Sequence, residues 1–285
     1  KVGEIQYSCM PNKNGGIVDD LLVYKFEDKF WLIVNAANLE KDFNWLDSQK
    51  FGDVQLINLS DEFGLLAIQG PNAQKLLEKI TDYNLEDMKY YTHAIAKIAG
   101  VDIFFSRTGY TGEDGFELYI PPQHADTLWE AITEAGKDMG LALIGLGARD
   151  SLRLEMKMAL YGNDIDDTTS PVEAGLSWIV NFDKDFIGAE TIKRHKAEKP
   201  SRRLVCLEID GKAFPRRGYE IYDGDEKLGV ITSGTMSPSL EKPIALAYLP
   251  KGKTKSGTKV EVSIRKNRFE ATVVKPPFYK NASHR

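Results

Sequence analysis

The sequence predicts an α+β fold followed by a small module built of strands alone. In the first part of the chain, runs with the two-residue alternation of strands are interleaved with runs of helical periodicity, which suits layered α+β lobes. Later, short apolar runs are separated by Gly, Pro and Asp at hairpin spacing, as in a small β-barrel or a jelly-roll-like module. A basic, polar stretch at 193–203 separates the two patterns. We therefore expect one domain at 1–198 and a second at 199–285.

Apolar periodicity, and the residues that interrupt it, place the individual elements. The turn residues at 11–16 end a first strand, and Pro71 suits the first turn of a helix, where its missing N–H does no harm. In the first domain, strands are expected at 4–10, 17–24, 30–34, 54–59, 65–69, 92–98, 101–105, 116–120 and 178–182. Helices are expected near 39–46, beginning within 70–73, at 124–139 and from 148. The strands expected in the second domain are 204–209, 219–222, 227–233, 244–248, 259–264 and 269–274.

Composition excludes several classes of function. The 285 residues are 42% hydrophobic and carry a net charge of −5 without a basic block, which argues against nucleic acid as a partner. No apolar run is long enough to cross a membrane, and the first residues lack signal-peptide features, so we expect an intracellular protein. Cys9 and Cys206 lie far apart with no second Cys or His at ligand spacing. We expect neither a disulfide nor a metal site.

The stretch 106–118 is the most informative part of the sequence. Three glycines fall within seven residues, at 109, 112 and 115, between two apolar strands. Glycine allows a close approach of the backbone to a flat or charged group, but it is also a common turn residue. A plain hairpin with a long turn does not explain why Tyr110 lies at the centre of the turn and Glu117 in an apolar strand. The pattern favours a binding site for a flat polar ligand.

Two adjacent carboxylates interrupt the strand expected at 17–24. Because side chains alternate between faces, one of Asp19 and Asp20 points to the side that Val18 and Leu22 occupy. An inward carboxylate is costly unless other groups hold it. Alternatively, the strand begins only after the pair, and both carboxylates are solvated in the turn. The sequence leaves the two interpretations about even.

Arg149 lies near the start of a helix expected from Ala148. An arginine there opposes the helix dipole, so an anionic or carbonyl partner is expected, either elsewhere in the fold or locally from Asp150 and Glu155. The acidic stretch at 160–176 lacks the central glycine and terminal glutamate of a calcium-binding EF-hand loop. We interpret it as loop and helix-capping chemistry. The two glycines before Arg149 do not make a dinucleotide-binding motif.

Six blocks of this sequence resemble the glycine cleavage system T-protein family, whose members are tetrahydrofolate-dependent aminomethyltransferases. The blocks are 14–21, 106–117, 145–150, 171–176, 233–240 and 275–279, and the resemblance extends over the whole chain. It implies two α+β lobes and a C-terminal antiparallel β-barrel around a central cavity. The family also has an earlier N-terminal segment, with an Asp-Val-Ser-His-Met block beside the folate site. This sequence begins after that segment, either by truncation or by omission.

The resemblance also implies a reaction and its residues. The aminomethyl group on the lipoyl arm of H-protein would be transferred to tetrahydrofolate, giving methylenetetrahydrofolate, ammonia and the reduced arm. Asp20 matches the family's catalytic aspartate, Tyr110 and Glu117 match pterin-site residues, and Arg149 matches an arginine of the same pocket. Tyr279 is a weaker match. No metal is implied. We expect Asp20, Tyr110, Glu117 and Arg149 to converge on one pocket.

Three alternatives remain at this point. One is the folate-binding domain of a dimethylglycine or sarcosine demethylase, although no dinucleotide fingerprint accompanies it here. Another is a non-catalytic folate-binding scaffold for iron–sulfur assembly, whose expected Lys-Gly-Cys-Tyr-x-Gly-Gln motif is replaced by the cysteine-free stretch 160–164. The third is a structural module whose acidic and aromatic residues have ordinary turn and core roles. The expected compartment is the bacterial cytoplasm, or the mitochondrial matrix in a eukaryote.

Overall fold

The computed structural model describes residues 1–283 and divides into two compact units. The first unit contains Lys1–Gln6, Leu22–Gly145 and, near the C-terminus, Ala282 and Ser283. The second contains Tyr7–Leu21 and Leu146–Asn281. The division runs through strands β1 (Ile5–Pro11) and β2 (Ile17–Lys25), which form a three-stranded sheet with β3 (Phe30–Ile33) in the order β1-β2-β3. The domain boundary expected at residue 198 stays a prediction of the sequence.

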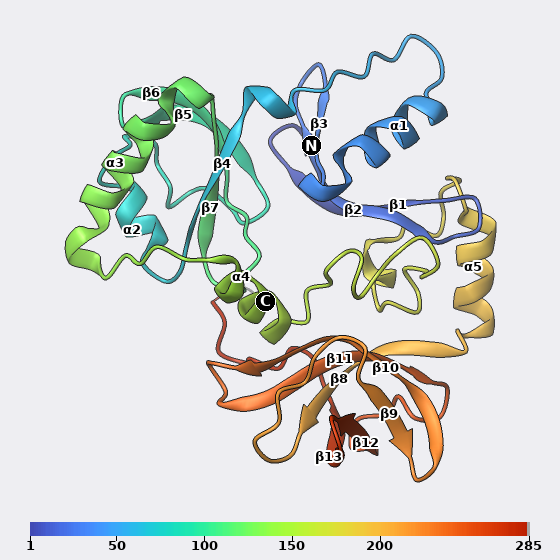
Figure 1. Ribbon diagram of the computed structural model, residues 1–285. Helices are drawn as coiled ribbons and strands as arrows, with labels where there is room; N and C mark the ends of the chain where they lie inside the picture. Colours follow the sequence, from blue (N-terminus) through green and yellow to red (C-terminus); the bar gives the residue numbers. More distant parts are fainter. Residues whose placement is uncertain (284–285) are drawn as a thin grey trace. The chain divides into compact units, whose positions relative to one another are not determined.

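The first unit is built on a four-stranded antiparallel sheet of order β4-β7-β6-β5. Two helices cover one face of this sheet, as Figure 1 shows in green and cyan. Buried side chains of both helices pack there against Phe105, Phe116 and Leu118. The strands and helices are β4 (Gly64–Gln69), β5 (His93–Ile98), β6 (Val101–Ser106), β7 (Gly115–Ile120), α2 (Ala73–Leu77) and α3 (Ala125–Gly136).

The opposite face of the sheet carries an aromatic cluster. Its buried members include Tyr24 of β2, Phe104 of β6 and Tyr119 of β7. The rings of Phe104 and Tyr119 stack with their centroids 4.7 Å apart, and Tyr24 meets Tyr119 edge-on. Strand β7 therefore has two different buried faces: alternate residues face the helices, and the residues between them face the aromatic cluster. Glu117 belongs to the second set, two residues before Tyr119, so it lies on the same face of the strand as the aromatic cluster.

The second unit contains a closed six-stranded antiparallel barrel of order β10-β11-β8-β13-β12-β9, drawn in orange and red in Figure 1. Its interior is filled by aliphatic side chains from all six strands. The expected C-terminal barrel is thereby confirmed, and the jelly-roll alternative is wrong. The strands are β8 (Arg202–Ile209), β9 (Glu220–Asp223), β10 (Glu226–Ser237), β11 (Lys242–Pro250), β12 (Lys259–Ile264) and β13 (Asn267–Val274). Helices α4 (Leu146–Glu155) and α5 (Ala189–Glu198) precede them.

Two expected strands are absent from the described chain, and one helix starts earlier than expected. After helix α1 (Leu39–Gln49), the stretch 54–59 is irregular, with Val54 and Ile57 mostly exposed. Residues 177–179 form a single 3-10 turn in which Trp178 is exposed. Apolar residues in a short window predict a strand only if a neighbouring strand pairs with them, and no such partner lies beside either stretch. Helix α4 begins at Leu146, before the expected Ala148.

We expect His93 to make the protein less stable as the solution is acidified. Burial against aromatic rings, including Phe26 at 4.4 Å, lowers the pKa of His93 in the folded chain. The unfolded chain therefore takes up this proton first, so stability is lost as pH falls below about 6.5, the usual histidine value. The change His93→Gln removes the titrating group but keeps a donor for the carbonyl of Lys25, which lies 3.0 Å from Nε2. Urea unfolding of both proteins at about pH 7.5 and about pH 5.5, which bracket that pKa, measures the free energy of unfolding. On acidification this free energy should fall less in the variant than in the unmodified protein. An equal fall in the two proteins would contradict the assignment.

Candidate active site

An arginine clamp fixes the shape of the loop that carries Tyr110. The Arg107 guanidinium forms a two-pronged ion pair with Asp114, at 2.9 Å from Nε to Oδ1 and 2.6 Å from Nη2 to Oδ2. Its Nη1 donates to the carbonyls of Leu85 and Met88, and its Nη2 also donates to Oε1 of Gln74. Both ends of the loop are therefore tied to each other, to α2 and to the segment that follows α2.

The side chain of Gln69 fills the base of the same loop. Its Nε2 donates to the carbonyls of Thr108 and Phe116, at 3.0 and 3.3 Å. A Cβ atom at Gly109 would lie 1.9 Å from Oε1 of Gln69, and one at Gly115 would lie 2.5 Å from the same side chain. Two of the three glycines thus make room for a group of the protein itself. The close approach that the sequence suggested is real, but at these positions the neighbour is Gln69 and not a ligand.

The first unit contains two of the predicted site residues, Tyr110 and Glu117. Both side chains are half-buried. Thr108 donates its hydroxyl proton to Oε2 of Glu117 over 2.5 Å. Burial raises the pKa of Tyr24 and Tyr91 to about 12, and the negative charge of Glu117 contributes to both shifts. Glu117 is therefore a carboxylate surrounded by phenols that stay protonated at neutral pH.

In the second unit, a tight turn positions the start of strand β2, which carries the predicted catalytic residue Asp20. The backbone N–H of Ile17, the first residue of β2, donates to the carbonyls of Asp166 and Thr169. At Gly16 a Cβ would lie only 1.7 Å from the carbonyl oxygen of Asp167. The side chain of Asn12 completes the turn by accepting from the N–H of Gly16 and donating to that same carbonyl. Only glycine fits where these two backbones meet.

The two adjacent aspartates belong to this strand and not to the turn before it. Asp19 is fully buried, whereas Asp20 is half-buried and accepts a 2.8 Å hydrogen bond from the hydroxyl of Tyr7. Asp19 in turn accepts from the backbone N–H of Asp20 at 3.0 Å. Burial raises the pKa of Cys9, and the charges of both aspartates raise it further, so that thiol is a poor nucleophile. The alternative in which both carboxylates are solvated is wrong.

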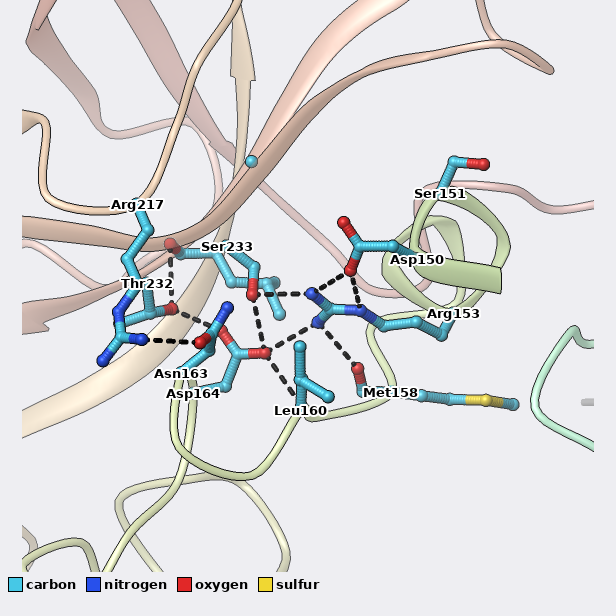
Figure 2. A network of polar contacts seen from close by, with 12 residues as sticks. Asp150, Ser151, Arg153, Met158, Leu160, Asn163, Asp164, Arg217, Thr232 and Ser233 are labelled. Atoms are coloured by element: carbon cyan, nitrogen blue, oxygen red, sulfur yellow. Dashed lines mark hydrogen bonds and ion pairs between the residues drawn. The ribbon is translucent and has the colours of Figure 1, made fainter. Parts of the chain in front are cut away.

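Helix α4, which carries Arg149, is held by a buried ion pair. Figure 2 shows Arg153 of this helix, 1% exposed, donating through Nη1 to Oδ2 of Asp164 at 2.7 Å. Its Nε and Nη2 bind Oδ1 of Asp150, and its Nη2 also donates to the hydroxyl of Ser233 in the barrel. A buried charge is tolerated only when paired and hydrogen-bonded in this way.

The carboxylate of the ion pair, Asp164, also accepts several hydrogen bonds from other groups. Asp164 is fully buried and accepts hydrogen bonds from the hydroxyls of Thr232 and Ser233 and from the N–H of Leu160. Its carbonyl accepts a 2.8 Å bond from the hydroxyl of Tyr248. The role of Asp164 thus goes beyond the loop and capping chemistry expected for the acidic stretch, because its carboxylate is a buried ion-pair partner. Its hydroxyl partners come from β10 and β11, more than sixty positions later in the chain, so no local pattern reveals them.

Helix α4 carries another buried acidic residue, Glu155, whose backbone carbonyl binds the predicted site residue Tyr279. Glu155, 2% exposed, accepts from the hydroxyls of Ser237 and Ser239, and its carbonyl accepts from the N–H of Tyr279 at 3.0 Å. Asp150 and Glu155, suggested as local partners of Arg149, bind Arg153 and these serines. The Arg149 side chain is exposed, and Tyr279 is half-buried.

The predicted site residues therefore fall into two groups. Tyr110 and Glu117 belong to the first unit, and Asp20, Arg149 and Tyr279 belong to the second. Their convergence on one pocket stays a prediction. Within residues 1–283, no three His, Cys, Asp or Glu side chains are grouped so that they could hold a metal ion. No helix in that part of the chain is both long and apolar enough for a membrane span.

Comparison with known proteins assigns the chain to a class. A model of the GCVT N-terminal domain matches residues 1–184, and a model of the glycine cleavage T-protein C-terminal barrel domain matches residues 202–280. The chain belongs to the glycine cleavage T-protein family, as its sequence blocks suggested.

Curated relatives and a solved structure specify the activity. The aminomethyltransferase of Flavobacterium psychrophilum is 50% identical over 281 residues, covering 98% of this chain and 78% of the relative. That of Halothermothrix orenii is 46% identical over 280 residues, with the same two coverages. The crystal structure of glycine cleavage system aminomethyltransferase T from Bartonella henselae matches with a TM-score of 0.92 and 34% identity, covering 100% of this chain and 78% of that one. The activity of this protein is that of an aminomethyltransferase of the glycine cleavage system.

We expect removal of the charge on Asp164 to destabilise the protein strongly. The change Asp164→Asn keeps the size of the side chain but leaves the buried guanidinium of Arg153 without its buried anion, which should lower the free energy of unfolding by about 3 kcal/mol. Asp150→Asn is the matched control, because Asp150 binds the same guanidinium with a side chain that is 51% exposed; its cost should stay below about 1 kcal/mol. Urea unfolding measures both. Equal effects would mean that burial of the pair does not decide its contribution.

Proposed function

We propose that this aminomethyltransferase uses tetrahydrofolate as co-substrate and receives the one-carbon unit from the aminomethylated lipoyl arm of H-protein. The observation that carries the proposal is Asp20, a half-buried carboxylate on a strand, oriented by the hydroxyl of Tyr7 at 2.8 Å. Family membership supplies the reaction class. The residues of the chain supply the groups that such a transfer requires.

The transfer exchanges two bonds at one carbon. The donor is a thioether bearing an aminomethyl group, S–CH2–NH2, and tetrahydrofolate offers two N–H groups. The C–S bond and the original C–N bond break, and two new C–N bonds to the folate form. One folate proton completes ammonia and the other completes the thiol, so atoms and charge balance without an oxidant. Loss of ammonia leaves an electron-poor carbon, which is the charge that the enzyme has to stabilise.

Asp20 is suited to this charge and to one of these protons. A carboxylate beside an electron-poor carbon stabilises it electrostatically, and it can accept the proton of the attacking folate nitrogen. The hydrogen bond from Tyr7 orients one of its oxygens, and Asp19 holds the backbone N–H of Asp20. A carboxylate fixed in this way requires little rearrangement as the charge develops. We assign Asp20 as the catalytic group.

Glu117 and Tyr110 are suited to recognition of the pterin ring. One edge of the pterin presents an amino group and a ring N–H, a donor pair that a carboxylate can accept in two parallel hydrogen bonds. The half-buried Glu117 provides such a carboxylate, and the half-buried ring of Tyr110 can pack beside a flat heterocycle or hydrogen-bond to it. Arg149 provides an exposed guanidinium for a pterin carbonyl or a carboxylate. Tyr279 is the fifth proposed contact, on weaker grounds.

The protein partner follows from the donor chemistry. The aminomethyl group is carried on a lipoyl arm, so the enzyme has to accept the H-protein that bears this arm. The glycine cleavage names of the family model and of the related structure support this partner. The compartment expected from the sequence, bacterial cytoplasm or mitochondrial matrix, stays a prediction.

The decisive assay is tetrahydrofolate-dependent ammonia release from aminomethyl-loaded H-protein, with Asp20→Asn as the test variant. Asparagine keeps the size of the side chain and an acceptor for Tyr7 but has no negative charge and no site for the proton. We expect kcat to fall at least about 100-fold, the scale of a lost general base, while the Kd for tetrahydrofolate changes little. Parallel losses in kcat and affinity would make Asp20 a binding group only. Ammonia release that does not depend on tetrahydrofolate would remove the proposed co-substrate.

For Glu117→Ala the expectation is the reverse. Loss of two charge-assisted hydrogen bonds to the pterin should raise the Kd for tetrahydrofolate about 100-fold, while kcat at saturating folate falls much less. Isothermal titration calorimetry gives the affinity directly. Asp102→Ala is a control, because Asp102 is an exposed carboxylate on the neighbouring strand β6. An unchanged affinity in Glu117→Ala would exclude Glu117 from folate binding.

A further inference from the structure

An unbroken chain of hydroxyl groups ends at Glu117. The phenol oxygens of Tyr119 and Tyr24 are 2.6 Å apart, and that of Tyr24 lies 3.3 Å from Oγ of Ser106. Oγ of Ser106 lies 2.6 Å from Oγ1 of Thr108, which donates to Oε2 of Glu117 over 2.5 Å. Five side chains from β2, β6, β7 and the residue that follows β6 by two positions thus form one polar path within the first unit.

The carboxylate fixes the direction of every bond in this chain. An ionised carboxylate only accepts hydrogen bonds, and a threonine hydroxyl has a single proton to donate. Because Thr108 donates this proton to Glu117, it has to accept the hydrogen bond from Ser106. The same reasoning makes Ser106 accept from Tyr24, and Tyr24 from Tyr119. Burial raises the pKa of Tyr24 to about 12, so this phenol keeps its proton at neutral pH. All four hydroxyl dipoles therefore point toward Glu117.

The hydroxyl chain is buried, and burial increases the contribution of its hydrogen bonds. The four hydroxyl residues are at most 3% exposed, and the two phenol rings pack against Phe104 in the aromatic cluster. Away from water, hydrogen bonds in series polarise one another, and an unpaired hydroxyl is costly. Ser106 and Glu117 are register partners on β6 and β7, so their side chains share one face of the sheet. The backbone thus holds Ser106 beside Glu117, and the Thr108 hydroxyl links the two side chains.

We propose that Thr108, supported by Ser106, Tyr24 and Tyr119, is a positioning residue that fixes the Glu117 carboxylate for recognition of the pterin. This inference rests on the proposed role of Glu117 in folate binding. Each carboxylate oxygen accepts more than one hydrogen bond, so the bond from Thr108 leaves Oε2 able to accept from a ligand as well. The hydroxyl chain fixes the plane and the charge of the group before folate arrives, which lowers the ordering cost of binding.

The test is a cycle of four proteins measured by tetrahydrofolate titration calorimetry. Thr108→Val removes only the hydroxyl at nearly constant volume, and its Kd should rise about 10-fold, the effect of one lost hydrogen bond to a charged group. Thr108→Ser keeps the hydroxyl and should bind within about 3-fold of the unmodified protein. In a Glu117→Ala background, Thr108→Val should cause no further loss, because the group through which it acts is gone.

Each outcome of the cycle has a distinct meaning. If Glu117→Ala weakens binding and Thr108→Val does not, the positioning role is overturned while the proposed function stands. If Thr108→Val weakens binding equally in both backgrounds, Thr108 acts by another route and the inference is also overturned. If Glu117→Ala itself leaves affinity unchanged, the proposed pterin contact has failed, and the positioning inference fails with it.

A purely structural role for the hydroxyl is distinguished by two further measurements. Urea unfolding without folate shows whether Thr108→Val alters the fold, and serine rescue of affinity shows that the hydroxyl itself is required. If Thr108→Val does not fold, Tyr24→Phe breaks the same chain farther from Glu117 by removing one oxygen. It should weaken binding about 2- to 5-fold, less than a direct contact. No change in affinity for Tyr24→Phe would overturn the inference that the chain extends beyond Ser106.

Discussion

The buried ion pair between Arg153 and Asp164 is the constraint on which the second unit depends. A guanidinium that is 1% exposed and a carboxylate that is fully buried are stable only together, and every donor and acceptor around them is matched with a hydroxyl, a backbone group or Asp150. The pair ties helix α4 to strand β10 of the barrel through Ser233 and Thr232, and Tyr248 of β11 donates to the backbone carbonyl of Asp164. The backbone that carries Arg149 is thereby fixed against an all-β module.

In the first unit, hydroxyl groups hold a charged side chain, where the second unit uses an ion pair. Its four-stranded sheet is covered on one face by helices and on the other by aromatic rings, so that a carboxylate on β7 lies in largely apolar surroundings. Glu117 is retained there because Thr108 donates to it and further hydroxyls follow in series. In both units, a buried or half-buried charged group is held by side chains from other elements of the fold.

In the loop with three glycines, contacts within the protein explain two of the glycines and the fixed ends of the loop. Two of the glycines admit the side chain of Gln69, and the ion pair of Arg107 with Asp114 fixes the ends of the loop. These features make the loop rigid and leave Tyr110 at its centre. The glycines at 109 and 115 therefore serve the packing of the loop, because a larger residue there would collide with Gln69. A loop of this composition without Gln69 at its base would be more mobile, because glycine leaves the backbone many conformations.

The sequence by itself determined the α+β class, the C-terminal barrel, most strands, the family and, through it, the aminomethyltransferase activity. These follow from local periodicity and from ordered blocks of residues, which are properties of neighbouring positions. Only the tertiary structure decided that Asp19 and Asp20 both belong to a strand, that Asp164 is a core residue and that 54–59 is not a strand. Each of these depends on a partner far away along the chain: Thr169 for the start of β2, Thr232 for Asp164, and a missing strand neighbour for 54–59. Burial and pairing are decided by such long-range contacts, which leave no local pattern in the sequence.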